Sequence, residues 1–286
     1  MSKQQVIVVT GSSSGFGRKT AERFADAGWQ VFATMRDSGG RHAEEAEALA
    51  ARGMRVVELD VTDQASADHA TAEILGEVEG VDVLVNNAGT SYFGPTEAFT
   101  VEVVKAQFDV NVFGPLRINR SLLPSMRERR SGLIVYISSL TGRLSLPGLG
   151  VYCASKFAIE AFAEAASYEL GPLGIDVAIV EPGAFTTNIS NSRVGPDDAQ
   201  RVTGYAHLRA TSAAIGAFLS ESAKGRDLDE VAEAIYRLAT SPPGSRPLRT
   251  PVPADTIVEG INTASALAHQ QLLAALGAPA TAELTT

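Results

Sequence analysis

Short runs of β-branched and other apolar residues recur along the first two thirds of the chain, and segments with helical spacing separate them. The first run, residues 6–9, reads VIVV and ends at Thr10-Gly11, which is typical of a buried parallel strand that enters a tight turn. The same pattern predicts strands at residues 30–34, 55–59, 81–85, 133–137 and 175–180. Prolines within residues 242–253 allow only a short edge strand there.

Helices are expected between the strands, at residues 18–27, 42–52, 65–76, 101–122, 151–170 and 228–239, with a last one at 263–276. Repeated βα units predict an α/β fold with a doubly wound, Rossmann-type parallel sheet of about seven strands and helices on both faces. The strand order is expected to reverse beside the turn at residues 11–17. The 286 residues fit one catalytic, dinucleotide-binding domain spanning residues 1–286.

The alternation weakens after Pro182, and residues 186–224 carry Gly195-Pro196, polar runs and an amphipathic piece at 207–219. So long an irregular excursion from a compact domain is usually functional or else partly disordered, and we favour a lid on the substrate side. Residues 277–286 are expected to form a flexible tail.

Composition excludes several classes of function. A formal net charge of −9 argues against a nucleic-acid partner, and no stretch approaches the ~18 apolar residues that span a bilayer, so no membrane segment is expected. The lone Cys153 cannot form an internal disulfide, and the four histidines lack ligand spacing, so no metal site is expected. These features favour a cytoplasmic protein.

A glycine-rich turn, TGSSSGFG at residues 10–17, lies between the first strand and the first helix. Its amides and the helix N-terminus are placed to hold a pyrophosphate. A turn without a ligand is the alternative, which the flanking strand and helix disfavour. The turn residues predicted to contact a dinucleotide are Gly11, Ser13, Ser14, Gly15, Phe16 and Gly17.

Tyr152 and Lys156 stand four residues apart on one face of a predicted helix, which puts a phenol beside an ammonium group. A phenol with a pKa near ~10 is a poor acid-base group at neutral pH, so a nearby cation that favours the phenolate would make it useful. An interfacial tyrosine with a solvated lysine is the common alternative for an isolated match.

The glycine turn, the sequence NNAG at residues 86–89 and the Tyr152/Lys156 pair, in this order, resemble the single-domain branch of the short-chain dehydrogenase/reductase family. The resemblance runs from about Val6 to Thr187. Within the family, VFATMR at residues 31–36 and VYCASKF at 151–157 look most like the subgroup of 17-beta-hydroxysteroid and retinol dehydrogenases.

This resemblance implies roles for further residues. Ser139 would be the catalytic serine that holds the substrate oxygen, with Ser138 as the alternate and a strand-end serine that satisfies backbone groups as the alternative reading. Asn111 would bend its helix and connect the active-site lysine to water. Asp60 and Val61 would contact adenine, although an aspartate that caps the next turn is the simpler explanation. The remaining contacts implied for the cofactor come from Asn87, Ala88, Gly89, Pro182, Gly183 and Thr187, besides Tyr152 and Lys156.

The choice of cofactor depends on the residues after the second strand, where NAD-selective members place an acid. Met35 stands at that position, and the guanidinium of the following Arg36 suits a 2′-phosphate, with a further hydrogen bond from Ser13. The sequence therefore predicts NADP(H) in preference to NAD(H); an ordinary surface arginine is the alternative.

The predicted function is an NADP(H)-dependent oxidoreductase that interconverts an alcohol and a carbonyl, with Tyr152 as general acid and base. A non-catalytic NADP-binding redox sensor on the same fold is the alternative. Apolar and aromatic residues at 91–93, 143–149 and 185 favour an apolar or aromatic small molecule as substrate. The resemblance also implies a homodimer or homotetramer formed through the helices at 101–122 and 151–170.

Overall fold

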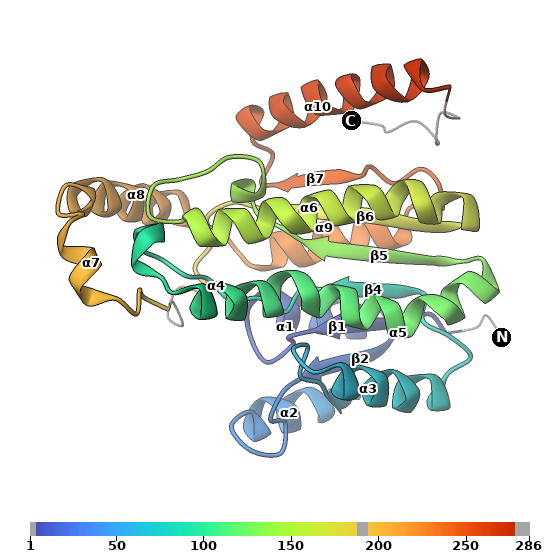
Figure 1. Cartoon of the computed structure of the whole chain (residues 1–286). Coiled ribbons are helices and arrows are strands. Elements are labelled where there is room, and N and C mark those ends of the chain that lie inside the picture. Colours follow the sequence, from blue (N-terminus) through green and yellow to red (C-terminus); the bar gives the residue numbers. More distant parts are fainter. Residues whose placement is uncertain (1–3, 188–193, 278–286) are drawn as a thin grey trace.

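One seven-stranded sheet organises the chain in a computed structural model that describes residues 4–187 and 194–277 (Figure 1). The strands follow the order β3-β2-β1-β4-β5-β6-β7, and every neighbouring pair is parallel. Their bounds are β1 (Val6–Thr10), β2 (Gln30–Met35), β3 (Arg55–Glu58), β4 (Val83–Asn86), β5 (Gly132–Ile137), β6 (Ile175–Pro182) and β7 (Arg249–Val252). The predicted doubly wound parallel sheet is confirmed.

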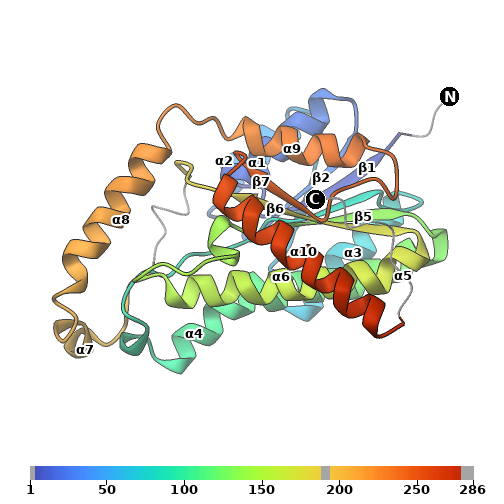
Figure 2. The same ribbon diagram turned by 90° about the horizontal axis from the view of Figure 1, so that it is seen from above.

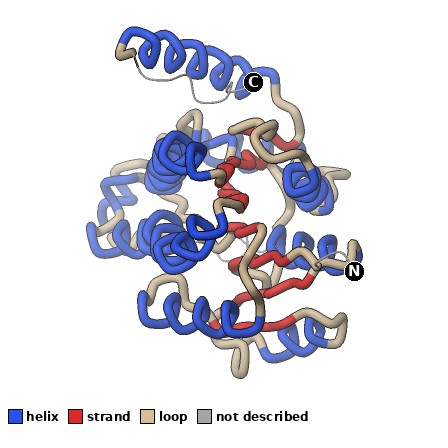
Figure 3. Tube along the Cα trace, turned by 90° about the vertical axis from the view of Figure 1, so that its right-hand side faces the viewer, coloured by secondary structure: helices blue, strands red, loops and turns tan. Residues whose placement is uncertain are grey.

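Helices cover both faces of the sheet, as the end-on view in Figure 3 shows. Ile7 and Val9 of β1 pack into the core beneath α1 (Gly15–Asp26), α2 (Ala43–Ala50) and α9 (Asp229–Thr240). Val6 and Val8 alternate to the opposite core, beneath α3 (Gln64–Glu77), α5 (Gly114–Arg129) and α6 (Gly150–Leu170). Because both faces are buried, the strands consist of continuous apolar runs.

The strand order reverses at β1. The chain proceeds outward from β1 to β2 and β3, then crosses back so that β4 pairs with the other edge of β1. Such a reversal opens a crevice at the carboxyl ends of the two central strands, because their following loops turn to opposite faces.

The helix predicted at residues 101–122 is interrupted. It consists of α4 (Val101–Phe108), one π-helical turn η2 (Asp109–Phe113) and α5, which continues to Arg129. Pro115 has no N–H to donate to the preceding turn, which accounts for a break in the regular ladder at this point. The helix is therefore interrupted at Asn111, where the family resemblance implied a bend.

The excursion is largely helical where the structure describes it, not irregular as expected. It contains α7 (Ala199–Thr203) and α8 (Leu208–Ser222), which extends away from the sheet in Figure 2. Residues 188–193 and 278–286, the latter nearly all of the expected tail, lie outside the described residues. Of the helices described, none is both long and apolar enough to cross a membrane.

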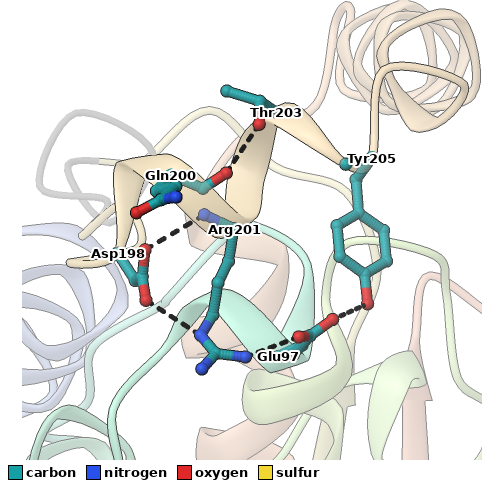
Figure 4. A pocket seen from close by; sticks show the side chains of 7 residues that line it. Glu97, Asp198, Gln200, Arg201, Thr203 and Tyr205 are labelled. Carbon is teal, nitrogen blue, oxygen red and sulfur yellow. Dashed lines mark hydrogen bonds and ion pairs between the residues drawn. The ribbon is translucent and has the colours of Figure 1, made fainter.

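Ion pairs fasten the excursion to the short helix η1 (Thr96–Ala98) (Figure 4). Arg201 lies 2.6 Å from Glu97 and 2.9 Å from Asp198, and the Tyr205 hydroxyl donates to Glu97 at 2.5 Å. These groups line a pocket of about 620 Å³ together with Gln200, Thr203 and Gly204. Because the charged side chains of this pocket pair with one another, we interpret them as contacts that attach the excursion to η1 and not as a binding site.

The last helix, α10 (Thr256–Ala275), begins seven residues before the predicted start at 263. Asp255 explains this, since its carboxylate accepts hydrogen bonds from the amides of Ile257 and Val258 and caps the helix. Figure 1 shows α10 beyond the edge strand β7. Polar contacts join it to the body: Asn262 donates to Glu181, and Arg143 donates to Ser265, each at 2.7 Å.

A buried cluster of charges lies between α6, β6 and β7. Arg249 donates to Glu160 at 2.9 Å and to Glu164 at 2.7 Å, and its guanidinium lies 4.0 Å from Glu181. Burial, and then the charge of Glu160, raise the pKa of Glu181 to about 8. Arg249 is therefore the cation that balances these carboxyl groups in a region of low polarity.

We expect a large loss of stability when the Arg249 cation is removed. Arg249→Ala leaves the almost fully buried Glu160 without its partner, which should lower the free energy of unfolding by about 3–5 kcal/mol in urea denaturation. Arg55→Ala, which breaks an exposed ion pair with Glu77, is the control and should shift the unfolding midpoint little. Equal shifts in the two variants would contradict this account of the cluster.

Candidate active site

A cleft of about 860 Å³ runs along the carboxyl edge of the central strands. With two exceptions, every site residue predicted from the sequence lines it; the exceptions are Gly17 and Asn111. The predicted residues that line the cleft are Gly11, Ser13, Ser14, Gly15, Phe16, Arg36, Asp60, Val61, Asn87, Ala88, Gly89, Ser139, Tyr152, Lys156, Pro182, Gly183 and Thr187. Residues far apart in the sequence are thus brought to one place.

The glycine turn packs directly on the loop after β4. Gly11 has φ +69°, and a Cβ there would lie 2.9 Å from the Ala88 Cα. A Cβ at Gly17 would lie 2.4 Å from the Gly11 carbonyl oxygen, so Gly17 serves close packing of the turn and does not face the cleft. The backbone can follow this path only with glycine at both positions.

Thr10 and Asn87 join the two loops by hydrogen bonds. The Thr10 hydroxyl accepts from the amides of Asn87 and Ala88 at 2.9 and 3.0 Å. The Asn87 side-chain amide donates to the carbonyls of Thr10 and Gly11 at 2.8 and 3.1 Å. These bonds orient the turn so that α1 begins at Gly15 beside the cleft, where its first amides can bind an anion.

Ser139, Tyr152 and Lys156 come together on one wall of the cleft. The Lys156 ammonium lies 5.8 Å from the centroid of the Tyr152 ring and donates to the Ile137 carbonyl at 2.8 Å. Burial lowers the pKa of Lys156 to about 8, although the charge of Glu160 opposes the shift. The lysine is therefore a cation that titrates near physiological pH.

The pKa of Tyr152 shifts in the direction opposite to the one expected from its lysine neighbour. Burial raises it to about 12, and a hydrogen bond with Ser139 offsets only part of this effect. The reason is desolvation of the phenolate, while the ammonium of Lys156 is engaged with the backbone. The phenol is thus held in its protonated form, which is the form that a general acid needs.

The structure separates the two candidate serines. Ser139 pairs with Tyr152, and its hydroxyl also accepts from the Thr141 amide and hydroxyl at 3.2 and 2.9 Å. Ser138 is 3% exposed, and its hydroxyl has no hydrogen-bond partner among the described residues. Both line the cleft, but the geometry favours Ser139 as the partner of the phenol.

Asn111 lies within the π-helical turn and is buried behind the cleft. Its side-chain amide donates to the Thr90 carbonyl at 2.9 Å and to the Ser155 hydroxyl at 3.0 Å, and its oxygen accepts from the Thr90 amide at 2.8 Å. These bonds connect the interrupted helix to α6, which carries Tyr152 and Lys156. The predicted link from the active-site lysine through Asn111 to water stays a prediction.

Arg36 and Asp60 line the cleft just after the carboxyl ends of β2 and β3. Asp60 accepts from the amide and hydroxyl of Thr62 at 2.9 and 2.7 Å, as the turn-capping alternative requires. Burial would raise the pKa of Asp60, but these bonds and the charges of Arg36 and Arg117 lower it. Met35 is only 2% exposed and belongs to the hydrophobic core, so an acid at this position would be largely buried.

Apolar side chains also line the cleft. Thr187 lines it next to Gly15, whereas Thr186 does not. Tyr92, Phe185 and Val194 contribute the aromatic and aliphatic wall. The loop at residues 143–149, which the sequence placed in the substrate pocket, does not line this cleft.

Sequence reasoning missed several residues that build the site. Thr10 and Thr90 act by holding neighbouring loops, and Arg41 and His42 line the cleft near Arg36. The place of Thr10 at the end of the first strand could have indicated its role. Arg41 and His42 stand in a polar loop whose path no periodic pattern determines.

Comparisons with known proteins agree with this arrangement. The model of the short chain dehydrogenase family matches residues 5–197. The chain is 38% identical over 189 residues to a 3-ketodihydrosphingosine reductase of Bacteroides thetaiotaomicron, covering 66% of this chain and 67% of that protein. It is 36% identical to the mitochondrial D-beta-hydroxybutyrate dehydrogenase of Mus musculus, covering 69% of this chain and 59% of the relative.

Solved structures agree as well. A short-chain dehydrogenase from Streptomyces avermitilis, 35% identical, superposes with a TM-score of 0.78 over 95% of this chain and 96% of that one. An alcohol dehydrogenase from Thermococcus sibiricus (26% identical, TM-score 0.70, covering 87% and 96%) holds 5-hydroxy-NADP. A short-chain dehydrogenase/reductase from Burkholderia phymatum (26%, TM-score 0.74, 91% and 92%) holds NAD.

The relatives therefore include both cofactor types, and they do not point specifically to the 17-beta-hydroxysteroid and retinol dehydrogenase subgroup that the motif spelling suggested. At the family level the matches and the fold agree. The chain belongs to the short-chain dehydrogenase/reductase family and is an oxidoreductase that acts on alcohol and carbonyl groups.

Proposed function

We propose that this chain is an NADP(H)-dependent oxidoreductase that reduces a ketone or aldehyde and oxidises the corresponding alcohol, with Tyr152 as general acid and base. One observation carries the proposal: Ser139, Tyr152 and Lys156 line the same cleft as the glycine turn. A dinucleotide in this cleft would place its adenosine near Arg36 and its nicotinamide near Tyr152.

The residues of the cleft fit a dinucleotide. The left-handed backbone at Gly11 and Gly15 leaves no side chain over the turn, and the first amides of α1 suit a pyrophosphate. Bound there, a nicotinamide cofactor supplies or accepts the hydride. Pro182, Gly183 and Thr187 would hold its nicotinamide end, and Lys156 would bind the adjoining ribose.

The chain's own contribution is positioning and proton management. In the reducing direction, the Ser139 hydroxyl holds the carbonyl oxygen while Tyr152 transfers its phenolic proton to that oxygen. Lys156 stabilises the phenolate that results, and the lysine carries its positive charge at a pH below its pKa of about 8. Asn111 keeps α6 in place through Ser155, and we propose that it also helps to return a proton to this site.

A non-catalytic NADP-binding redox sensor is the alternative function on this fold. Such a protein needs the glycine turn and Arg36 but has no use for a serine and a lysine beside a buried phenol. The pairing of Ser139 with Tyr152 favours the enzyme.

Preference for NADP(H) rests on Arg36, which lines the cleft directly after β2. Ser13 lines the same end and can donate a hydrogen bond to a 2′-phosphate. The buried Met35 offers no carboxylate to the ribose hydroxyls that NAD-selective relatives bind. Arg36 is the only one of these three residues with a charge suited to the phosphate.

The substrate is proposed to be apolar or aromatic around its carbonyl, since Tyr92, Phe185 and Val194 line the same cleft as Tyr152. One relative is named for a 3-keto compound and another for a hydroxy acid, and both names describe alcohol and carbonyl chemistry. The described end of the excursion contributes Val194 and is fastened at η1, which supports a role as a lid.

We also propose that the chain self-associates as a homodimer or homotetramer. Phe113, Phe157 and Phe162 are each more than 40% exposed, and they lie on the π-helical turn and on α6, within the region expected to form the interface.

Tyr152→Phe tests the general acid. This change keeps the ring but removes the hydroxyl, so turnover should fall by about 10²- to 10⁴-fold while NADPH binding persists. Tyr168→Phe is the matched control, because it removes a phenol from the same helix, α6, outside the cleft, and its activity should stay near that of the wild type. Steady-state rates together with NADPH titrations measure both effects; full activity in Tyr152→Phe would reassign the acid.

The pKa values predict the pH dependence of reduction. Tyr152 stays protonated up to a pKa of about 12, whereas Lys156 loses its charge as the pH rises through about 8. The ratio kcat/KM should therefore be highest below pH 8 and should decline above it with the titration of one group. In Lys156→Arg, whose cation persists to much higher pH, the remaining activity should lose this alkaline decline. An unchanged decline would exclude the lysine as its source.

Arg36→Ala tests the cofactor preference. A charge-assisted contact to a phosphate contributes about 1.5–3 kcal/mol, so its loss should weaken NADPH binding by roughly ten- to a hundredfold. NADH lacks the phosphate and should be affected little. Titration of both cofactors against both proteins provides the comparison. If the wild type prefers NADH, or if both cofactors weaken equally, the NADP assignment fails.

A further inference from the structure

A compact turn at residues 37–42 connects β2 to α2 and lies next to Arg36. Asp37 is its first residue, with a left-handed backbone at φ +54°. Its carbonyl accepts from the amides of Gly40 and His42 at 3.2 and 3.0 Å, and its carboxylate accepts from the Arg41 amide at 3.1 Å. Arg41 and His42 both line the cleft, so this turn brings a second arginine to the cleft that Arg36 lines.

One carboxylate from the neighbouring strand holds the start of this turn. Glu58, the last residue of β3, accepts from the Asp37 amide at 2.5 Å, from the Ser38 amide at 2.7 Å and from the Ser38 hydroxyl at 2.5 Å. Burial would raise the pKa of Glu58, but these hydrogen bonds outweigh it and lower the pKa. Glu58 therefore stays ionised and keeps its full capacity as an acceptor.

Arg36 is thereby fixed on both sides. Before it, Met35 pairs with Glu58 in the β2–β3 ladder, and the Met35 carbonyl accepts from the Leu59 amide at 2.9 Å. After it, Asp37 is bound to the Glu58 side chain. The long side chain of Arg36 is exposed, and fixing the backbone from which it extends removes part of the freedom that binding would otherwise cost.

We propose that Glu58 is a positioning residue for cofactor choice: its carboxylate fixes the turn that presents Arg36 and Arg41 to a 2′-phosphate. This inference rests on the proposed NADP(H) preference and adds Arg41 as a second cation of the same subsite. Glu58 itself does not line the cleft and acts through the backbone that it holds.

Whether substitution of Glu58 strengthens or weakens binding of a 2′-phosphorylated ligand distinguishes a positioning role from a direct electrostatic one. A carboxylate near a phosphate repels it, so loss of the Glu58 charge alone would tighten binding of the phosphorylated ligand. Loss of the hydrogen bonds would release the turn and weaken that binding. Glu58→Gln keeps one acceptor oxygen without the charge, whereas Glu58→Ala removes both.

Calorimetric titration with adenosine 2′,5′-bisphosphate and with adenosine 5′-monophosphate measures the contribution of the 2′-phosphate without catalysis. In the wild type the bisphosphate should bind more tightly than the monophosphate, and the ratio of the two affinities is the advantage that the 2′-phosphate gives. Glu58→Ala should reduce this advantage by about fivefold or more, and Glu58→Gln by less. Glu44→Ala removes a like charge from the first turn of α2 and is the control, which should retain the advantage.

A double-mutant cycle tests the route of the effect. In an Arg36→Ala, Arg41→Ala background, Glu58→Ala should change the 2′-phosphate advantage by less than about twofold, because the cations that it positions are gone. Thermal unfolding of each variant identifies a general loss of structure, which would weaken the binding of both nucleotides alike.

The outcomes separate the two proposals. If the wild type gains nothing from the 2′-phosphate, or if Arg36→Ala leaves that gain unchanged, the NADP preference fails and this inference fails with it. A different result overturns only the role of Glu58, and the cofactor preference stands. In that result Arg36→Ala lowers the gain, whereas Glu58→Ala leaves the gain equal or greater, or lowers the affinity for both nucleotides equally.

Discussion

The contact between the loops that follow β1 and β4 is the constraint on which the rest of the site depends. The Thr10 hydroxyl and the Asn87 amide join these loops, and the close packing of Gly11 on Ala88 leaves no room for a side chain between them. This contact exists because the strand order reverses at β1, so that two strands distant in sequence end side by side. It directs the start of α1 toward the cleft that Ser139, Tyr152 and Lys156 also line.

The catalytic wall depends on burial as much as on proximity. Desolvation moves the pKa of Tyr152 upward and that of Lys156 downward, so the phenol keeps its proton and the ammonium titrates near neutral pH. Glu160 moderates the shift of Lys156 and also belongs to the cluster around Arg249. The same buried charges that stabilise the packing of α6 therefore influence the electrostatics of the site.

The sequence predicted the features that depend on local pattern. Apolar runs in a parallel sheet are continuous, so the strands could be located within a few residues, and the glycine turn could be placed between a strand and a helix. The family resemblance implied a bend at Asn111 but not its π-helical form, because that form depends on Pro115 and on side-chain bonds to Thr90 in another loop.

Other features of the site depend on contacts between distant residues. The direction of the Tyr152 pKa shift follows from burial, which no spacing reveals. The hydrogen bond from the Asp37 amide to Glu58 connects the ends of the neighbouring strands β2 and β3. The ion pair between Arg201 and Glu97 attaches the excursion to η1. Spacing alone pointed to Lys156 as the dominant influence on the tyrosine, and the structure shows that desolvation outweighs it.

The central claim is that the cleft performs hydride transfer and does not merely bind a dinucleotide. Initial rates across a panel of ketones, aldehydes and secondary alcohols, each with NADP(H) and with NAD(H), test it most directly. The account predicts that at least one apolar or aromatic carbonyl compound is reduced, with oxidation of NADPH in equal amount and a higher kcat/KM for NADPH than for NADH. Tight binding of NADPH without turnover of any member of the panel would contradict it and would favour the redox sensor.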